Sequence, residues 1–235
     1  MTIPHTEFSG RAPQDTLPVA ALLLLAAGML DAYTYVGYGG VFANAMTGNI
    51  VILMIRIAHG DFAEGARYIY PIAAYVCGVA VAHTLKEKPF DAWVKYPARV
   101  SLAIELLLLA VVALVPGVPD WAIVTGIAFV AALQATAFTR VGTFAFTSVT
   151  TSANLRHLAE SFMAAVVFRR GVAAWRELRF FATVVSCFFA GALIGAASAY
   201  AFGHTAVWLP FALLSGALIL CMPWNRRVHE ILQRN

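Results

Sequence analysis

The sequence has few charged residues, and this shortage excludes an ordinary soluble protein. Only 12% of the 235 residues are charged, whereas soluble domains carry about 25%. Hydrophobic residues make up 61%, and the mean hydropathy is +0.77. A chain of this composition needs lipid around most of its surface. The net charge of +4 does not indicate nucleic acid, because the basic residues stand in short loops beside apolar runs.

Cysteines and known catalytic motifs are also scarce. Cys77, Cys187 and Cys221 lie inside apolar runs and form no CxxC pair, so neither a disulfide framework nor a zinc site is predicted. The chain contains no Walker A, GxSxG or HExxH pattern. We therefore predict no metal and no cofactor, and an enzyme is the less favoured class.

Long apolar runs, by contrast, are abundant, and each crossing of a membrane needs about 20 mostly apolar residues. Six runs approach this length: 17–38, 68–85, 98–115, 121–138, 180–202 and 206–222. Two further runs, 41–58 and 141–168, are interrupted by polar residues. No linker separates the runs, so we predict a single membrane domain over 17–222, a polar segment over 1–16 and a basic tail over 223–235.

Basic residues predict the orientation of these spans, since Lys and Arg concentrate in cytoplasmic loops. They cluster at Lys86 to Arg99, at Arg169 to Arg179 and at Arg226 to Arg234. With all three clusters and both termini in the cytoplasm, 41–58 and 141–168 must each enter and leave by one face, from opposite sides. Seven or eight complete crossings are the alternative, and Arg56 and Arg67 favour it because they lie near the face assigned to the outside.

The two interrupted runs resemble each other. Thr47-Gly48-Asn49-Ile50 aligns with Ser152-Ala153-Asn154-Leu155 at an offset of 105, and Leu30-Asp31-Ala32 aligns with Leu133-Gln134-Ala135 at an offset of 103. The chain then divides into two units, about 17–115 and 121–222, of three spans and one broken segment each. Because three is odd, the second unit is inverted. The predicted fold is an all-α integral membrane protein with about six transmembrane helices, two re-entrant segments and an inverted 3+3 repeat, an architecture typical of transporters and channels.

The polar turn of each broken segment has two interpretations. Thr47 or Asn49 can cap a helix beginning at Ile50, and Gly48 permits backbone conformations that other residues resist. The free N–H groups of such a helix start can hold an anion or a polar group. Ser152 and Asn154 support the same argument in the second half. Alternatively, these side chains only satisfy the backbone where a helix is broken inside a membrane.

Residues 28–53, GMLDAYTYVGYGGVFANAMTGNIVIL, carry a family resemblance. Gly28, Asp31, Ala32, Gly39 to Phe42 and Met46 to Asn49 stand as in the YoaK-like family of bacterial multi-pass membrane proteins, domain of unknown function 1275, which this chain resembles over about 17–222. In the second half, Ser152-Ala153-Asn154-Leu155-Arg156 stands where the family commonly has Thr-Gly-Asn-Leu-Arg. The resemblance implies about six spans in the bacterial inner membrane and brings no activity, substrate or catalytic residue.

Ionisable side chains inside spans are costly and mark candidate sites. Asp31 lies within the first span, and its repeat partner is Gln134, so each half can direct one polar group to the centre. The predicted binding residues are Asp31, Asn44, Thr47, Gly48, Asn49, Gln134, Ser152 and Asn154. The alternative for Asp31 is a protonated carboxyl bonded to a carbonyl. Glu105, near the start of its span, is expected to pair with Arg99 or to reach water.

Two other groups of residues have competing interpretations. Arg156, His157 and Glu160 are candidates for a proton relay, with His157 and Glu160 on one helical face. They are not predicted to bind metal, because no second such pair supplies the remaining ligands. Gly191 and Gly195 let helices approach closely, first for packing within the bundle and second for a homo-oligomer.

The leading functional hypothesis is a small-solute transporter or channel in the bacterial inner membrane, with a midplane site between the two Thr-Gly-Asn-like turns. The expected partners are the lipid bilayer and a small polar or anionic solute. A membrane enzyme acting on a lipid or quinone is the alternative that Arg156, His157 and Glu160 favour. A non-catalytic membrane scaffold is the alternative that the glycine stripe favours.

Overall fold

The structure, a computed structural model, describes residues 14–85, 87, 96–115 and 117–222. Its helices are α1 (Leu17–Gly37), α2 (Met46–His59), α3 (Phe62–Thr84), α4 (Pro97–Leu114), α5 (Asp120–Ala137), α6 (Ser152–Phe162), α7 (Val172–Phe202) and α8 (Trp208–Leu220). A π-helical turn, η2 (Met163–Val167), continues α6, and a 3₁₀ turn, η3 (Gly203–Val207), joins α7 to α8. Two short antiparallel strands, β1 (Arg140–Val141) and β2 (Phe144–Ala145), follow α5.

The predicted all-α membrane fold is confirmed. Within the described ranges, five helical stretches are long and apolar enough to cross a membrane: 17–37, 62–84, 97–114, 120–137 and 172–220. Helix α2 is apolar but shorter. The predicted N-terminal segment up to residue 13, the basic loop over 88–95 and the tail over 223–235 lie outside the described residues.

Helices α3 and α7 begin earlier than the apolar runs predicted, at residue 62 instead of 68 and at 172 instead of 180. The first turns of α3 and α7 each belong to a helical hairpin, α2–α3 or α6–α7, in which they pack against the preceding helix. In the first hairpin the backbone of Gly65 lies against Leu53 and Ile57. Hydropathy missed these turns because they carry charged side chains such as Glu64, Arg67 and Arg176, which point outward.

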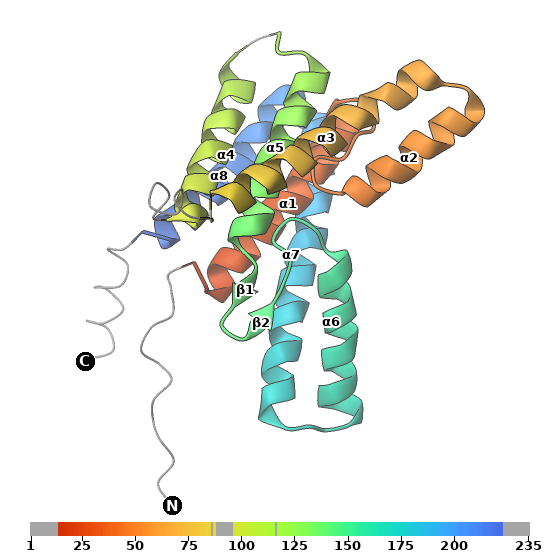
Figure 1. The fold of residues 1–235 in the computed structure, drawn as a ribbon. Coiled ribbons are helices and arrows are strands. Elements are labelled where there is room, and N and C mark those ends of the chain that lie inside the picture. Colours follow the sequence, from red (N-terminus) through yellow and green to blue (C-terminus); the bar gives the residue numbers. More distant parts are fainter. Residues whose placement is uncertain (1–13, 86, 88–95, 116, 223–235) are drawn as a thin grey trace, which may run out of the picture.

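The helices of the two halves interlock in matching pairs (Figure 1). Helix α1 packs along α7, and α5, which the internal alignment pairs with α1, packs along α3; α1 also contacts α8, as α5 contacts α4. Both long pairs run parallel: Gly191 and Gly195 of α7 face Leu25 and Met29 of α1, while Tyr70 and Gly78 of α3 face Trp121 and Phe129 of α5. Each half is therefore completed by helices of the other.

Small residues make the α1–α7 contact close. A Cβ on Gly191 would collide with the carbonyl oxygen of Leu25, and one on Gly28 with the carbonyl oxygen of Phe188. Gly195 is similarly close to the backbone of Met29. The glycine stripe thus packs within the bundle, the first of its two predicted uses, and a second copy of the chain would find these glycines covered.

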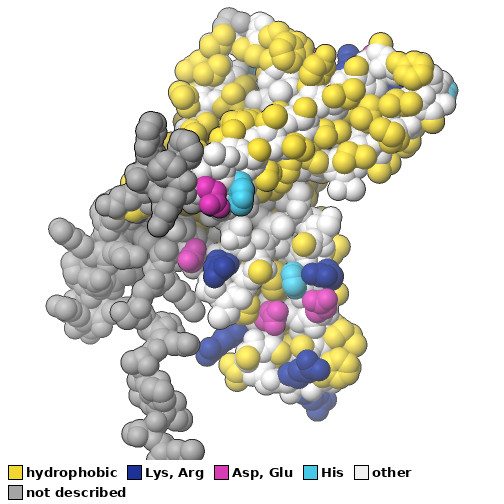
Figure 2. All heavy atoms as spheres, in the orientation of Figure 1, with side chains coloured by type: hydrophobic (Ala, Val, Ile, Leu, Met, Phe, Trp, Pro, Cys, Tyr) yellow, Lys and Arg dark blue, Asp and Glu magenta, His cyan; other side chains and the backbone are white. Residues whose placement is uncertain are grey.

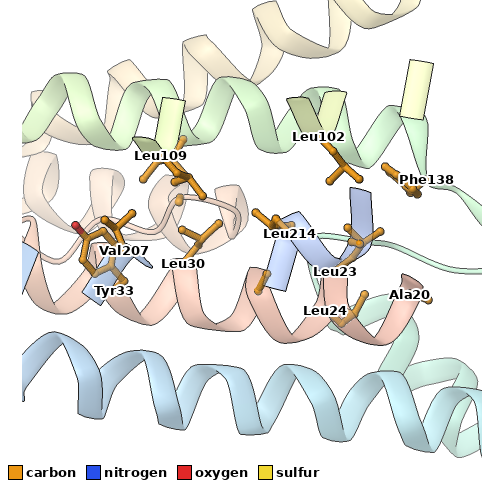
Figure 3. Close-up of a cluster of buried hydrophobic side chains, with 14 of the residues drawn as sticks. Ala20, Leu23, Leu24, Leu30, Tyr33, Leu102, Leu109, Phe138, Val207 and Leu214 are labelled. Atoms are coloured by element: carbon orange, nitrogen blue, oxygen red, sulfur yellow. The ribbon is translucent and has the colours of Figure 1, made fainter. Parts of the chain in front are cut away.

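The core lies where α1, α4 and α8 meet (Figure 3). Leu23 and Leu30 of α1, Leu102 and Leu109 of α4, and Leu214 of α8 are all buried. At one end of this core the Tyr33 hydroxyl lies 2.6 Å from the Tyr38 hydroxyl and donates to the carbonyl oxygen of His204 at 3.0 Å. These bonds tie the end of α1 to η3.

The two hairpins, α2–α3 and α6–α7, project from different ends of the molecule (Figure 1). Because Gly191 faces Leu25, helical rise places Val172 about 16 Å beyond the first residue of α1. Figure 2 shows hydrophobic side chains over α2 to α5 and charged side chains gathered over the α6–α7 hairpin. The exposed apolar residues of α2 include Ile50, Val51, Met54 and Ile55.

Candidate functional site

The chain returns along α1 after that helix ends. The backbone N–H of Asn44 donates to Oδ1 of Asp31 at 2.7 Å, and Nδ2 of Asn44 donates to the carbonyl oxygen of Ala27 at 3.0 Å. Upstream, the N–H of Ala43 donates to Oγ1 of Thr34 at 3.1 Å. Since Asp31 and Ala27 stand six and ten residues before Gly37, the hydrogen bonds of Asn44 lie about 9 to 15 Å back from the end of α1.

Asn49 fixes the turn that leads into α2. Its Oδ1 accepts the N–H of Phe42 at 2.9 Å, and its Nδ2 donates to the carbonyl oxygen of Phe42 at 2.7 Å. The side chain is fully buried. One amide group thus satisfies both backbone polar groups of a residue that belongs to no helix or strand.

The predicted capping of α2 is wrong. The helix begins at Met46 rather than Ile50, and its N-cap residue, Ala45, makes no side-chain cap. Asn49 therefore lies inside the first turns and reaches back to Phe42 instead of capping. Gly48 has ordinary helical geometry, and its missing side chain leaves room for the Phe42 ring, which lies 3.1 Å from where a Cβ would stand.

The second half repeats this arrangement. Oδ1 of Asn154 accepts the N–H of Thr147 at 3.1 Å, and Nδ2 donates to the carbonyl oxygens of Thr147 at 2.8 Å and Thr150 at 3.1 Å. Asn49 and Asn154 each bind a residue seven positions earlier. In both halves the amide satisfies a broken stretch of backbone, which is the structural alternative considered for these turns.

Gln134 occupies the place of Asp31 in the second half. Its Nε2 donates to the carbonyl oxygen of Ser148 at 3.0 Å, and the Ser148 hydroxyl donates back to the carbonyl oxygen of Gln134 at 3.3 Å. Oε1 of Gln134, although buried, has no hydrogen-bond partner. Because Gln134 is three residues from the end of α5, this return is only about 5 Å deep.

The predicted site residues therefore fall into two buried clusters and an exposed remainder. Asp31, Asn44 and Asn49 lie in the first cluster; Gln134 and Asn154 lie in the second. Thr47 and Ser152 are exposed, and Gly48 is half-buried beside Phe42. Ser148 and Thr147 were missed as individual residues, and the signal that could have found them is the Thr/Ser-rich stretch before Asn154.

A cavity adjoins each broken segment. The first, of about 440 Å³, lies between α3, the start of α5 and the turn after α1, and its lining includes Gly39, Val41, Arg67 and Asp120. The second, of about 1110 Å³, lies between α7, the start of α1 and the β-hairpin, and its lining includes Asp15, Val141, Arg176 and Arg179. We call them the α3–α5 cavity and the α1–α7 cavity. They involve corresponding elements of the two halves.

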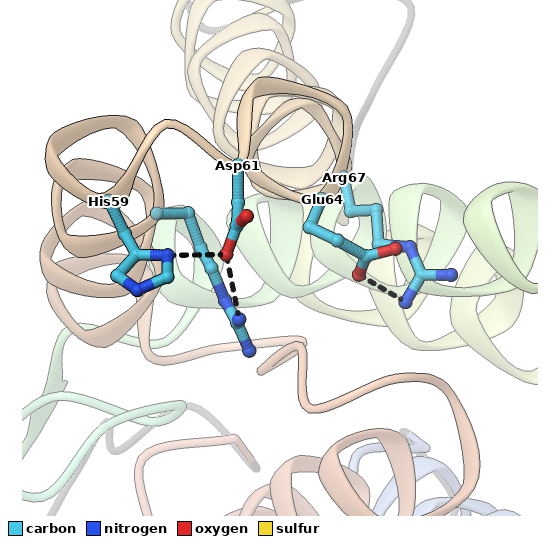
Figure 4. A network of polar contacts seen from close by, with 5 residues as sticks. His59, Asp61, Glu64 and Arg67 are labelled. Atoms are coloured by element: carbon cyan, nitrogen blue, oxygen red, sulfur yellow. Dashed lines mark hydrogen bonds and ion pairs between the residues drawn. The ribbon is translucent and has the colours of Figure 1, made fainter.

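Both cavities carry charges of both signs. Arg67 in the α3–α5 cavity is paired with Glu64 at 3.1 Å, beside the Asp61 network at the tip of the α2–α3 hairpin (Figure 4). In that network Oδ2 of Asp61 lies 3.2 Å from Nδ1 of His59. In the α1–α7 cavity, partial burial raises the pKa of Asp15, and the positive charge of Arg140 opposes that rise. Arg140 itself is exposed on β1.

The Arg156, His157 and Glu160 group lies on an exposed face of α6. Glu160 is 3.3 Å from His157 and 3.8 Å from Arg156, so the predicted side-by-side placement is correct. The His157 ring stacks on Phe181 of α7, with centroids 4.9 Å apart. None of the three lines either cavity. The described residues contain no cluster of three or more His, Cys, Asp or Glu that could hold a metal ion.

Comparison with known proteins identifies a matching protein family. The sequence profile described as "Protein of unknown function (DUF1275)" matches residues 19–220. UPF0700 transmembrane protein YoaK of Bacillus subtilis (strain 168) is 26% identical over 206 residues, which make up 85% of this chain and 91% of the relative. No solved structure matches the chain. The matches extend over nearly all of the predicted membrane domain.

Proposed function

The chain belongs to the DUF1275 family of proteins of unknown function, and from that premise we propose that it moves a small polar or anionic solute across the bacterial inner membrane. Helices α2 and α6 would act as re-entrant half-helices. The units 17–115 and 121–222 would form an inverted repeat, with both termini in the cytoplasm.

The observation that carries this proposal is the matched pair of broken segments. Asn49 holds the backbone of Phe42 and Asn154 holds that of Thr147 with the same two hydrogen bonds. Non-helical backbone at membrane depth occurs where protein buries it or where it lines a water-filled cavity, and it is common at transporter binding sites. A protein needing only a rigid bundle gains nothing from breaking two helices in this way.

The two cavities support a route for solute. The α3–α5 cavity adjoins the first broken segment at Val41, and the α1–α7 cavity adjoins the second at Val141. Under the proposed topology the cavities open toward opposite faces. Arg67 and Arg176 would then attract an anionic solute at either entrance.

Asp31 is the residue proposed to bind a proton or cation during transport. Its Oδ1 accepts the N–H of Asn44, so the state of this carboxyl is coupled directly to the first broken segment. It is 5% exposed, which makes a charge at this position costly without a counter-ion. Loading and unloading a cation here would shift segment 41–45 against α1.

Stopped-flow light scattering on proteoliposomes tests the proposal with a panel of probes: formate, acetate, nitrate, glycerol and urea. We expect the wild-type protein to speed volume recovery for at least one probe over protein-free vesicles. Asp31→Asn should lower that rate by about tenfold or more, equivalent to about 1.4 kcal/mol of barrier. It should keep its thermal stability, because the amide oxygen can still accept the Asn44 N–H.

Asp61→Asn is the matched control. Asp61 lies half-buried at the hairpin tip, away from both broken segments, so this variant should leave the rate unchanged. Recovery at the protein-free rate for every probe would refute transport of these solutes. Full flux through Asp31→Asn would leave transport in place and remove the role of Asp31.

A further inference from the structure

Helix α4 carries a carboxyl group into the core of the bundle. Glu105 is 2% exposed and stands on the same helix face as Leu102 and Leu109, which point into the core (Figure 3). Its Oε2 has no hydrogen-bond partner. Among the ion pairs that join described residues, none includes Glu105.

The predicted partner of this carboxyl is engaged elsewhere. Nε of Arg99 donates to the carbonyl oxygen of Cys221 at 2.8 Å, and its guanidinium lies 4.2 Å above the centre of the Tyr96 ring. The expectation that Glu105 pairs with Arg99 is therefore wrong, and the Glu105 side chain is buried instead of lying at the surface. The cause is geometric: Glu105 lies on the core face of α4, whereas Arg99 binds the backbone just beyond α8.

The elements packed on α4 bring few other titratable groups near it. These groups are Asp120 at the start of α5, His204 in η3, Asp31 and Tyr33 on the core helix α1, and Cys221 after α8. Helix α8 itself has none. Asp31 is hydrogen-bonded to Asn44, and the hydroxyl of Tyr33 to the carbonyl oxygen of His204. Among the described residues no ion pair gives Glu105 a cation. An unpaired carboxylate in such surroundings takes up a proton rather than remain charged.

A small cavity lies beside Ser101, between α4 and the ends of α3 and α5. It has a volume of about 40 Å³ and is lined by Leu85, Pro97, Ser101 and Ala137, among others. That volume is enough for one water molecule, which needs about 10–15 Å³ or more. The buried Ser101 hydroxyl has no hydrogen-bond partner, and Ser101 stands one turn before Glu105 on the same face of α4. Water in this cavity would therefore meet a hydroxyl one helical turn from the carboxyl.

We propose that Glu105 and Ser101 form a proton-binding site in the bundle core, filled through the cavity at Ser101. Proton binding is inferred from the burial of Glu105 and from the lack, among the described residues, of a hydrogen-bond partner for its Oε2 and of an ion-pair partner. The use of this site, to couple proton movement to solute movement, rests on the proposed transport function.

Infrared spectroscopy of the protein in liposomes tests the binding. Wild-type protein should show the C=O stretching band of a protonated carboxylic acid, and Glu105→Gln should remove the part of this band that remains in Asp31→Asn. The band should disappear as the pH is raised, because deprotonation removes the C=O–OH group. Glu87→Gln, which removes an exposed carboxyl, is the matched control and should keep the band. Asp31→Asn shows how much of the band belongs to Asp31.

Ser101→Ala provides the second variant. It should keep the band and slow its response to a pH jump, because the relay hydroxyl is gone. A spectrum that is identical in wild type and Glu105→Gln would overturn the proposal. An unchanged pH-jump response in Ser101→Ala would refute the route through Ser101.

The flux assay separates this proposal from the proposed function. If the band titrates and is lost in Glu105→Gln while no probe moves in wild type, the proton site stands and transport fails. If the probes move equally well at every pH in wild type and in Glu105→Gln, transport stands and coupling through Glu105 is refuted.

Discussion

At the scale of single residues, the side chains of two asparagines satisfy backbone groups that helices and strands satisfy elsewhere. Asn49 and Asn154 each place an amide against the N–H and the C=O of one residue in a broken segment. In a protein surrounded by lipid, water cannot replace these bonds. The pair therefore allows the chain to leave helical geometry before α2 and before α6 without unsatisfied backbone groups.

Replacing either asparagine by leucine should destabilise the protein. Leu keeps a similar volume and leaves two buried backbone groups unsatisfied, at about 1–3 kcal/mol each. We expect Asn49→Leu and Asn154→Leu each to lower the free energy of unfolding by about 2 kcal/mol or more. Thermal unfolding in detergent would measure it. Thr47→Val and Ser152→Ala, at exposed positions in the same first turns, should stay within about 0.5 kcal/mol of wild type.

Internal alignment identified these asparagines from the sequence, since a fixed offset pairs them. Their roles were harder to predict. Capping was inferred from residue type, but the partner of Asn49 is seven residues upstream in a segment without periodicity. The environment of Glu105 was missed for another reason: its distance from the end of α4 was known, but the face on which it lies depends on tertiary packing.

At the scale of elements, close helix approach determines the bundle. The backbone of α7 lies against that of α1 at Gly191 and Gly195, and the backbone of α3 lies against that of α5 at Gly78, where a Cβ would stand 2.6 Å from the carbonyl oxygen of Phe129. In lipid, where hydrophobic burial does not drive helices together, such contacts supply much of the association. The glycines are therefore structural.

Gly191→Ala should separate α1 from α7 locally, because the new methyl group would meet the backbone of Leu25, which cannot rotate away. Overpacking of this kind costs about 1–3 kcal/mol. The matched control is Gly216→Ala in α8, where the nearest atom to the added Cβ is a side-chain carbon of Leu22 at 3.7 Å. Unfolding in detergent should show a loss for Gly191→Ala alone; equal stability of the two variants would contradict the packing argument.

Hydropathy predicted the apolar helices well and their ends less well. Helices α1, α4 and α5 fall within one residue of the predicted runs, because each is apolar over most of its length. The charged first turns of α3 and α7 and the β-hairpin at Arg140 to Ala145 were missed. Their stability comes from neighbouring segments, such as Phe144 packing beside Phe180 at 5.2 Å between ring centres, and no local pattern records that contact.

At the scale of the whole molecule, the interlocked pairing has a consequence for assembly. Since α1 packs on α7 and α5 on α3, the most extensive helix contacts of each half are made with helices of the other half. A chain cut after residue 115 would lack α7, so the face of α1 that packs against Gly191 and Gly195 would be exposed to lipid. The two hairpins are the exception, because α2–α3 and α6–α7 are each continuous in sequence.

The hairpin tips also provide the test of the inverted repeat. Single cysteines at His59, Pro119 and Val172, on a background lacking Cys77, Cys187 and Cys221, would occupy exposed positions. His59→Cys and Pro119→Cys should react with an impermeant maleimide on intact spheroplasts, and Val172→Cys only after permeabilisation. The reason is that α3 and α5 run parallel, so their starts share a face, while α7 runs parallel to α1 from the other. Labelling of all three from one side would exclude two units of opposite sense, and the pairing of α1 with α7 would then need another explanation than an inverted repeat.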